Sequence, residues 1–230
     1  VQIDGVTYEM KDTLLPTVDP DNPYALTGEE LDVMKRLCSS FLHCEKLQRH
    51  IQLLLKKGSI YRVYNDNLLY HGCVPMNEDG EFTSVNIYGN YYSGKALFDV
   101  LESYVRKAFF ASDPVEKEKG ADMIWYIWTA PNSPLYGRAK MATFERYFLD
   151  DEDVKVEPKN AYYNLINDPK IADKILKEFG LEGSGVHIIN GHVPVHRMRG
   201  ESPVKSDGKV IVIDGGFSKA YRSRTGIAGY

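Results

Sequence analysis

The sequence predicts an α/β fold in which helices and sheets form layers, an α+β layered arrangement. Segments with helical periodicity alternate along the chain with short apolar segments that have the length of strands. Three of the short segments, residues 123–128, 186–190 and 210–214, are almost continuously apolar, which is typical of strands buried on both faces. The sequence shows no internal repeat that would favour a different architecture.

The N-terminal part is expected to begin irregularly and then to form one long helix. Residues 1–26 are rich in Pro, Asp and Asn, which predicts a short strand followed by an irregular connection. Thr27 and Glu30 have the spacing of a capping box, and apolar residues then recur at helical intervals as far as Gly58. We therefore expect a single helix that ends at this glycine.

A hairpin, a further strand and a second helix are expected next. Two short apolar segments flank Asn65 and Asp66, which are typical turn residues, and His71 follows the second segment. Residues 81–94 predict another strand with a glycine turn. An amphipathic helix is expected to start near Ser93, because apolar residues then recur on one face.

The remainder of the chain is expected to contain buried strands, a long insertion and one more helix. The charged residues 115–120 are expected to form a solvated segment between the second helix and the strand at 123–128. Residues 129–163 predict a loop-rich insertion dense in Pro, Tyr, Arg and acidic residues. A third helix is expected to begin at Asp168 and to end at Gly180.

Composition limits the functions that the chain can have. With 230 residues, 43% of them hydrophobic, the chain can bury the core of one large domain or of two small ones. A net charge of −4 argues against nucleic acid as a partner, and no apolar segment is long enough to span a membrane. The odd cysteine count favours a reducing, cytoplasmic location. Because the chain starts without Met and stops in a strand-like stretch, we expect it to belong to a longer protein.

Two histidines share one sequence context that is typical of ligand sites. His71 and His192 each follow an apolar strand and each has a glycine beside it, and α/β folds bind ligands at the carboxyl ends of strands. For either histidine alone, a structural role in the core is the more common outcome. The repetition of the context makes a shared metal site an equally good interpretation.

Basic residues in two regions are candidates for binding an anion. Arg138 follows a glycine in a Pro-rich loop, with Lys140 and Arg146 close behind, and arginine suits bidentate recognition of phosphate. The alternative is that Arg138 and Arg146 pair with the acidic run 150–153. Lys219 and Arg222 follow a buried strand and a glycine pair, where the alternative is a solvated surface.

Several long motifs resemble one enzyme family over the whole of the chain. They are "NLLYHGCVP", "MATFERYF", "IINGHVPV", "GESPVKSDGK" and "VIDGGFSKAYRSRTGIAGY". Together they resemble the class III fructose-1,6-bisphosphatases of bacteria, a branch of the calcineurin-like metallophosphoesterases. The resemblance implies the C-terminal part of a much longer chain and a calcineurin-like β-sandwich flanked by helices.

The resemblance also implies roles for individual residues. In the superfamily two metal ions, typically manganese, are held by Asp, His and Asn ligands and by two late histidines, which match His71 and His192. In the phosphoprotein-phosphatase branch a Trp-ended strand, a Pro loop and an arginine precede a Thr-Phe pair. Trp128 and Arg138 occur in that order here, so Arg138 resembles the arginine that binds phosphate. The turn before Tyr221 falls where that branch approaches its active site.

The early superfamily motifs, Gly-Asp-x-His, Gly-Asp-x-x-Asp-Arg and Gly-Asn-His, do not occur in residues 1–230. These motifs supply most of the metal ligands and the general-acid histidine. The resemblance therefore implies that residues 1–230 are the C-terminal part of a metallophosphoesterase domain whose upstream metal-binding half lies outside this chain. We expect this chain alone to be inactive.

The resemblance implies that the complete protein hydrolyses the 1-phosphate of fructose 1,6-bisphosphate, a reaction of gluconeogenesis. The expected substrate is a sugar bisphosphate, and a homo-oligomer is one possible assembly of the protein. A protein or dinucleotide phosphatase on the same scaffold is one alternative. A non-catalytic binding or assembly module is another, because the upstream motifs are missing here. Lys140, Arg146, Lys219, Tyr221 and Arg222 are weaker candidates for the residues that bind the substrate.

Overall fold

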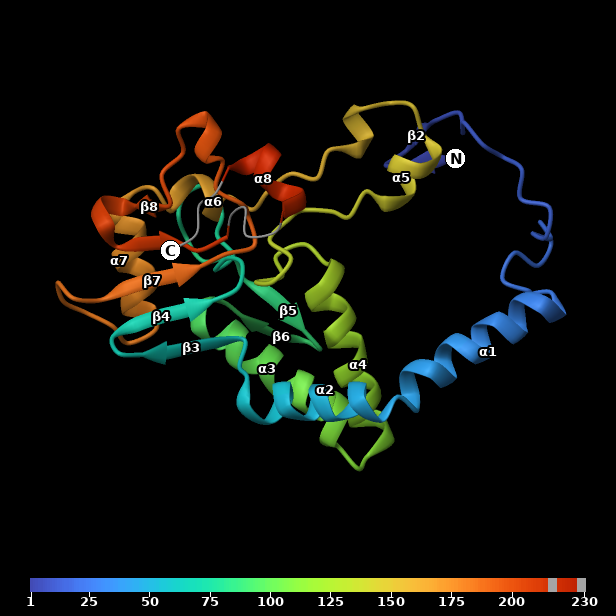
Figure 1. Cartoon of the computed structure of the whole chain (residues 1–230), viewed down its shortest axis with the longest axis horizontal. Helices are drawn as coiled ribbons and strands as arrows, with labels where there is room; N and C mark the ends of the chain where they lie inside the picture. The colour runs from blue at the N-terminus through green and yellow to red at the C-terminus, as the bar shows by residue number, and fades with distance from the viewer. Residues whose placement is uncertain (215–218, 227–230) are drawn as a thin grey trace. The chain divides into compact units, whose positions relative to one another are not determined.

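A computed structural model describes residues 1–214 and 219–226, without the side chain of Tyr221. The chain divides into two compact units, which are described separately. Residues 1–58 and 142–156 form the first unit, and residues 59–141 and 157–230 form the second. The elements of both units are labelled in Figure 1.

The first unit is mainly helical, and the expected long helix is two helices. The capping box of Thr27 and Glu30 is present at the start of α1, and the chain leaves the helix at His43 and restarts after Cys44, which has an extended backbone. The prediction of one helix as far as Gly58 was therefore wrong at this junction. No residue of α1 or α2 is buried, so the apolar face that the periodicity predicts is exposed. The elements of this unit are β1 (Gln2–Ile3), β2 (Val6–Thr7), α1 (Gly28–Leu42), α2 (Glu45–Lys57), α5 (Thr143–Phe148) and η1 (Asp153–Lys155).

The second unit is built on a five-stranded sheet with the strand order β3-β4-β7-β9-β8. The three central strands β4, β7 and β9 are parallel, and the two edge strands pair antiparallel to them. Figure 1 shows the arrowheads of β4 and β7 pointing the same way, so that both strands end at one edge of the sheet. The strands are β3 (Tyr61–Tyr64), β4 (Asn67–Tyr70), β7 (His187–Asn190), β8 (Val204–Lys205) and β9 (Val210–Val212).

The hairpin predicted around Asn65 and Asp66 and the two predicted strands near the C-terminus are confirmed by this sheet. Asn65 and Asp66 both have positive φ, which suits the tight turn between β3 and β4. Burial alternates along both strands: Ile188 and Asn190 are buried in β7, and Val210 and Val212 are buried in β9. The remaining residues of the two strands are only half-buried, so the expectation of strands buried on both faces is not met.

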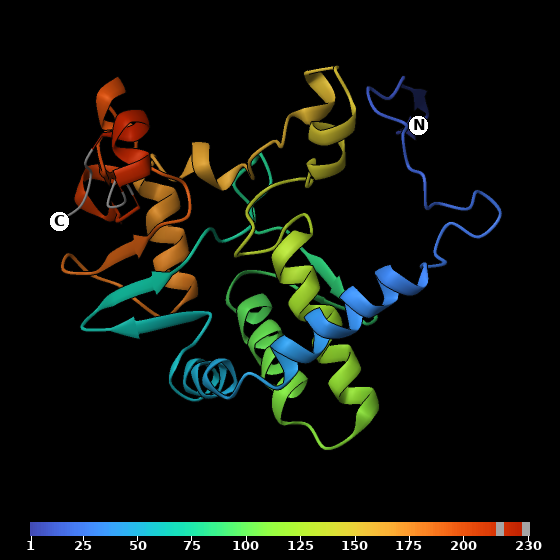
Figure 2. The same ribbon diagram turned by 45° about the vertical axis from the view of Figure 1, so that its right-hand side comes forward.

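A small hairpin and a pair of helices form the other half of this unit. The antiparallel strands β5 (Val85–Ile87) and β6 (Asn90–Tyr92) precede α3 (Gly94–Phe110), and α4 (Pro114–Thr129) follows. The sequence predicts one strand with a glycine turn where the structure has two strands, and the helix start near Ser93 is confirmed. Helices α3 and α4 lie side by side (Figure 2). Gly120 lies where a β-carbon would collide with the backbone of Ala108, so glycine permits this close packing.

The strand expected at residues 123–128 does not exist, because this segment is the second half of α4. Asp113 caps the helix by accepting hydrogen bonds from the amides of Val115 and Glu116, and a proline follows at the first helical position. The residues 115–120 are therefore the first turns of this helix, not a solvated connection. Trp125 and Trp128 are 69% and 70% exposed, which explains why an apolar segment without polar alternation misled the prediction.

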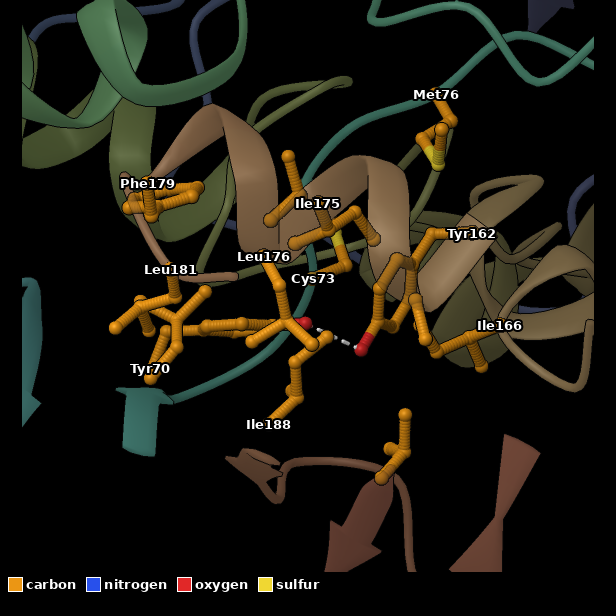
Figure 3. Close-up of a cluster of buried hydrophobic side chains, with 14 of the residues drawn as sticks. Tyr70, Cys73, Met76, Tyr162, Ile166, Ile175, Leu176, Phe179, Leu181 and Ile188 are labelled. Atoms are coloured by element: carbon orange, nitrogen blue, oxygen red, sulfur yellow. Dashed lines mark hydrogen bonds between the residues drawn. The ribbon is translucent and has the colours of Figure 1, made fainter. Parts of the chain in front are cut away.

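The main core lies between the sheet and α7 (Pro169–Glu178), together with α6 (Tyr162–Leu165). Asp168 caps α7 and Gly180 follows it with a φ of +79°, as the sequence predicts. Figure 3 shows the buried side chains of this cluster, with Tyr70 and Tyr162 meeting through their hydroxyl groups. The other elements of this unit are η2 (Arg197–Arg199), η3 (Ser206–Gly208) and α8 (Lys219–Thr225).

The described residues thus form a mixed α/β structure, in agreement with the predicted fold class. Their largest sheet has five strands, and the calcineurin-like β-sandwich stays a hypothesis about the complete domain. Within the described ranges, no helix has both the length and the apolar character needed to cross a membrane.

A candidate metal site at the ends of two parallel strands

The two predicted histidines meet at the edge where β4 and β7 end. The register pairs Leu68 with Ile188 and Leu69 with Ile189, so both strands finish at the same level. His71 is the first residue after β4, and His192 is the second residue after β7. Their nitrogens His71 Nε2 and His192 Nδ1 lie 3.0 Å apart, although 121 positions separate them in the sequence. The expected approach of these two side chains is confirmed.

A backbone carbonyl fixes the protonation state of His192. Its Nε2 lies 2.9 Å from the carbonyl oxygen of Tyr136, which can only accept a hydrogen bond, so Nε2 carries the proton. In the neutral ring the lone pair is then on Nδ1, the atom that faces His71. Burial of the ring is the main cause that lowers the pKa of His192, and the nearby His71 lowers it further. The ring is therefore held neutral and in the tautomer that can act as a ligand.

The backbone of His192 adopts an uncommon conformation. Its φ is +69°, in the left-handed region that few non-glycine residues occupy and that is enriched at functional sites. Gly191 does not have positive φ, and a β-carbon there would make only ordinary contacts, 3.5 Å from Asp214 Cβ and 3.8 Å from the oxygen of His71. A β-carbon at position 191 would therefore be accommodated without a collision.

Gly72, in contrast, is required by close packing. A β-carbon at this position would lie 2.5 Å from the carbonyl oxygen of Pro134, and the amide of Cys73 donates to the same oxygen at 2.9 Å. Glycine therefore allows the loop after α4 to pack against the end of β4. The same loop brings the Tyr136 carbonyl to His192.

A buried chain of hydrogen bonds joins the two strand ends beneath the histidines. The Asn190 side-chain amide, 4% exposed, donates to the carbonyl of Gly72 at 3.0 Å and to the Tyr162 hydroxyl at 2.8 Å. That hydroxyl lies 2.6 Å from the hydroxyl of Tyr70 (Figure 3). Because Gly72 and Asn190 each lie within two residues of a histidine, these bonds fix the positions from which both rings project.

One side of the histidine pair borders an apolar cavity of about 530 Å³. It is lined by Ile60, His71, Val105, Ile124, Ile127, Trp128, Leu135, Tyr136, Met141 and His192. This lining is predominantly hydrophobic, so on this side the polar groups concentrate at the two rings.

Arg138 lies near the histidine pair, but in this structure it pairs with an acid. Its guanidinium donates to the carbonyl of Glu157 at 3.1 Å and lies 3.8 Å from the carboxylate of the same residue. Its positive charge contributes to the lowered pKa of His192, which places Arg138 within electrostatic reach of the site. The acid that it pairs with is therefore Glu157, outside the expected run 150–153. The segment before Arg138 is also helical, so the match to a Trp-ended strand fails.

The other predicted binding residues are scattered. Lys140 is half-buried in the loop after Arg138, and Arg146 is on α5 in the other unit. Lys219 and Arg222 are exposed on α8. The side chain of Tyr221 and the glycine pair at 215 and 216 lie outside the described residues.

The histidine pair fits part of a metal site. Two nitrogens bound to one ion at about 2.1 Å would lie about 3.0 Å apart for a 90° angle at the ion and about 3.4 Å apart for a tetrahedral angle, and the separation of His71 Nε2 and His192 Nδ1 lies at the lower end of this range. Among the described residues, no group of three or more His, Cys, Asp or Glu is placed to bind a metal. The described part of this chain therefore offers two nitrogen atoms that could serve as ligands.

Sequence reasoning missed the residues that support the histidines. Tyr136 acts through its backbone carbonyl, which no side-chain pattern reveals. Asn190 and Tyr162 are buried polar residues, and the position of Asn190 at the end of an apolar strand is the signal that could have indicated a buried network.

Comparisons with known proteins identify the family. The chain belongs to the Firmicute fructose-1,6-bisphosphatase family, whose model matches residues 1–230. It is similar to proteins named fructose-1,6-bisphosphatase class 3, with 52% identity to that of Clostridium novyi and 53% to that of Alkaliphilus metalliredigens. All of this chain is covered in both comparisons, but it spans only 35% of the length of each relative. No solved structure gives a significant match.

Proposed function

We propose that this chain is the C-terminal part of a class 3 fructose-1,6-bisphosphatase domain, and that the complete enzyme converts fructose 1,6-bisphosphate to fructose 6-phosphate and phosphate. Family membership over residues 1–230 supports the reaction. The observation that carries the chemistry is the 3.0 Å approach of His71 Nε2 to His192 Nδ1, with the tautomer of His192 fixed. The upstream segment of the same polypeptide would supply the remaining ligands and complete the calcineurin-like sandwich.

In this proposal the two histidines hold one of two manganese ions. Ions held there would supply a water of lowered pKa as the nucleophile and would compensate the charge on the phosphate oxygens. His192 presents Nδ1 because Tyr136 accepts the proton on Nε2, and the bonds of Asn190 keep the ends of β4 and β7 at a constant separation. These residues fix the ligand nitrogens before substrate arrives, which reduces reorganisation during the reaction.

Arg138 is proposed to bind the reacting phosphate. Its contact with the Glu157 carboxylate is 3.8 Å long, beyond the usual hydrogen-bond length, so a dianionic phosphate would compete well for the guanidinium. Lys140, Arg146, Lys219, Tyr221 and Arg222 stay secondary candidates for contacts with the substrate.

We further propose a cytoplasmic enzyme that acts without nucleic acid or membrane, in gluconeogenesis, with a homo-oligomer as its possible assembly. The free cysteines Cys38, Cys44 and Cys73 and the net charge of −4 support this location and this choice of partners.

Phosphate release by the full-length enzyme tests the proposed reaction. With manganese present, we expect rapid release from fructose 1,6-bisphosphate and much slower release from a phosphopeptide or a dinucleotide. A preference for the phosphopeptide or the dinucleotide would favour a protein or dinucleotide phosphatase instead. Absence of release from all three substrates would favour a binding or assembly module.

A further inference from the structure

A second cavity, of about 450 Å³, borders the end of β7 and is lined by both polar and apolar residues. This volume is in the range of small-molecule sites. Its charged lining residues among those described are Lys159, Lys205 and Glu201, and amide side chains of Asn164, Asn167 and Asn190 contribute further polar groups. The cavity therefore carries one positive charge in excess within a chain whose net charge is −4.

Lys159 is the source of this excess charge. Lys205 lies 3.1 Å from the carboxylate of Glu201, which also accepts a hydrogen bond from the His196 amide at 2.9 Å, so these two charges compensate each other. Lys159 forms no ion pair within the described part of the chain, and its ammonium lies 6.0 Å from the centre of the Tyr163 ring. Partial burial and the charge of Arg138 lower the pKa of Lys159, Glu201 partly opposes this shift, and Lys205 adds to it.

The fold places the positive charges of Lys159 and Arg138 close together. Their repulsion is unfavourable, and a bound anion would offset it. Arg138 and Lys159 are joined by a backbone bridge between their segments, which keeps two positive side chains near each other. Like charges in a partly desolvated site repel one another, and a bound dianion converts this repulsion into attraction. Phosphate is the common biological anion that amine and guanidinium groups recognise in this way.

The cavity is also connected to the candidate metal site. Asn190 and Gly191 line it, and His192 is the next residue in the chain. The loop that carries the Tyr136 carbonyl to His192 continues to Arg138, whose backbone is bridged to Lys159, so one segment contacts both sites. A molecule with two phosphate groups could place one group at each site.

We infer that the cavity lined by Lys159 and Lys205 is a phosphate subsite, and that it holds the phosphate of the sugar bisphosphate that does not react. The inference rests on the proposed function. In this inference Lys159 is the main contact to the second phosphate, and Lys205 is a second donor. Lys159 would therefore make the enzyme prefer a bisphosphate to a monophosphate.

Kinetics of the full-length enzyme with Lys159→Ala test this inference. We expect the KM for fructose 1,6-bisphosphate to rise about tenfold to a hundredfold with little change in kcat, because a contact equally present in the ground and transition states is lost. Hydrolysis of fructose 1-phosphate, which carries the reacting phosphate alone, should not change. Lys159→Arg should restore most of the affinity. Lys170→Ala, at an exposed lysine on α7, is the matched control and should behave as the wild type.

Calorimetry on metal-stripped protein gives a readout independent of turnover. Fructose 6-phosphate and inorganic phosphate should bind the wild type more tightly than Lys159→Ala, whereas both proteins should have the same melting temperature. Equal KM values and equal affinities in the two proteins would overturn the subsite. Phosphate binding that needs Lys159, with an unchanged KM for the bisphosphate, would show a site for a separate ligand and overturn the substrate assignment. A wild type that binds phosphate through Lys159 but does not hydrolyse the bisphosphate would refute the proposed function while leaving an anion site.

Discussion

At the scale of single residues, the candidate site depends on groups that hold the two histidines in place. His192 combines a left-handed backbone with a fixed tautomer and a lowered pKa. The tautomer is fixed by a carbonyl of the neighbouring loop, and the pKa is lowered mainly by burial. Strand-end position and adjacent glycine were sufficient to find both histidines in the sequence. The partner that fixes the tautomer is a carbonyl, and every residue has one, so the sequence could not single it out.

Replacing Tyr162 by Phe should destabilise the protein and disturb the site. The change removes the hydroxyl that joins Asn190 to Tyr70 and leaves buried polar groups unpaired, which costs about 1–3 kcal/mol in the free energy of unfolding. Tyr163→Phe is the matched control, because no hydrogen bond to the buried Tyr163 hydroxyl is found among the described residues, so its loss should cost little. Urea denaturation of both variants measures the difference. Equal stabilities would mean that the network does not hold the strand ends together.

Replacing Arg138 by Ala should lower kcat/KM of the full-length enzyme by about a hundredfold or more. The reason is that losing a charged contact to the reacting phosphate raises the free energy of the transition state by about 3–4 kcal/mol. Arg138→Lys should recover only part of the activity, since lysine cannot form two parallel hydrogen bonds. Steady-state kinetics with thermal melting separate this role from a structural one. If the alanine variant melts much earlier while its folded fraction has normal activity, pairing with Glu157 is the true role of Arg138.

At the scale of elements, the sequence predicts most helices and strands correctly where caps and turns are explicit. The capping box at Thr27, the turn at Asn65 and Asp66 and the cap at Asp168 all occur as expected. The segment 123–128 failed because its periodicity is obscured by tryptophans that are exposed on α4. The stronger signal was upstream, where Asp113 and Pro114 form a helix start.

The contact between the loop after α4 and the end of β4 gives a prediction at this scale. Gly72→Ala should force the Pro134 carbonyl away, displace the Tyr136 carbonyl from His192, and lower both stability and metal affinity. Gly191→Ala should be tolerated in folding, because its β-carbon would make only ordinary contacts. Thermal melting with and without manganese compares the two variants. A stable Gly72→Ala protein with normal stabilisation by manganese would refute the proposed role of this packing.

At the scale of the whole molecule, the chain spans about a third of the length of the relatives that it matches. The long motifs were sufficient to predict the family, because together they cover all parts of the chain. The β-sandwich could not be tested in the same way, since the described residues contain one five-stranded sheet and two small hairpins. The complete ligand set likewise requires residues beyond the two histidines.

A protein of these 230 residues alone should have no phosphatase activity with manganese. Two histidines cannot hold the pair of ions that the proposed reaction needs, so a water would not be activated near neutral pH. Phosphate release should be measured on a sample whose mass shows that it starts at Val1. Turnover that survives removal of trace contaminating phosphatase would contradict the proposal that an upstream segment completes the site.

The central claim, that His71 and His192 bind one ion, is tested most directly by a crystal structure of the full-length enzyme with manganese, using anomalous scattering to locate the metal. The account predicts an anomalous peak about 2.0–2.3 Å from both His71 Nε2 and His192 Nδ1, with the hydrogen bond from His192 Nε2 to Tyr136 retained. In His192→Ala that peak should weaken or disappear while the sheet stays intact. A manganese-loaded enzyme in which the two rings remain hydrogen-bonded to each other, with the ions bound elsewhere, would contradict the account.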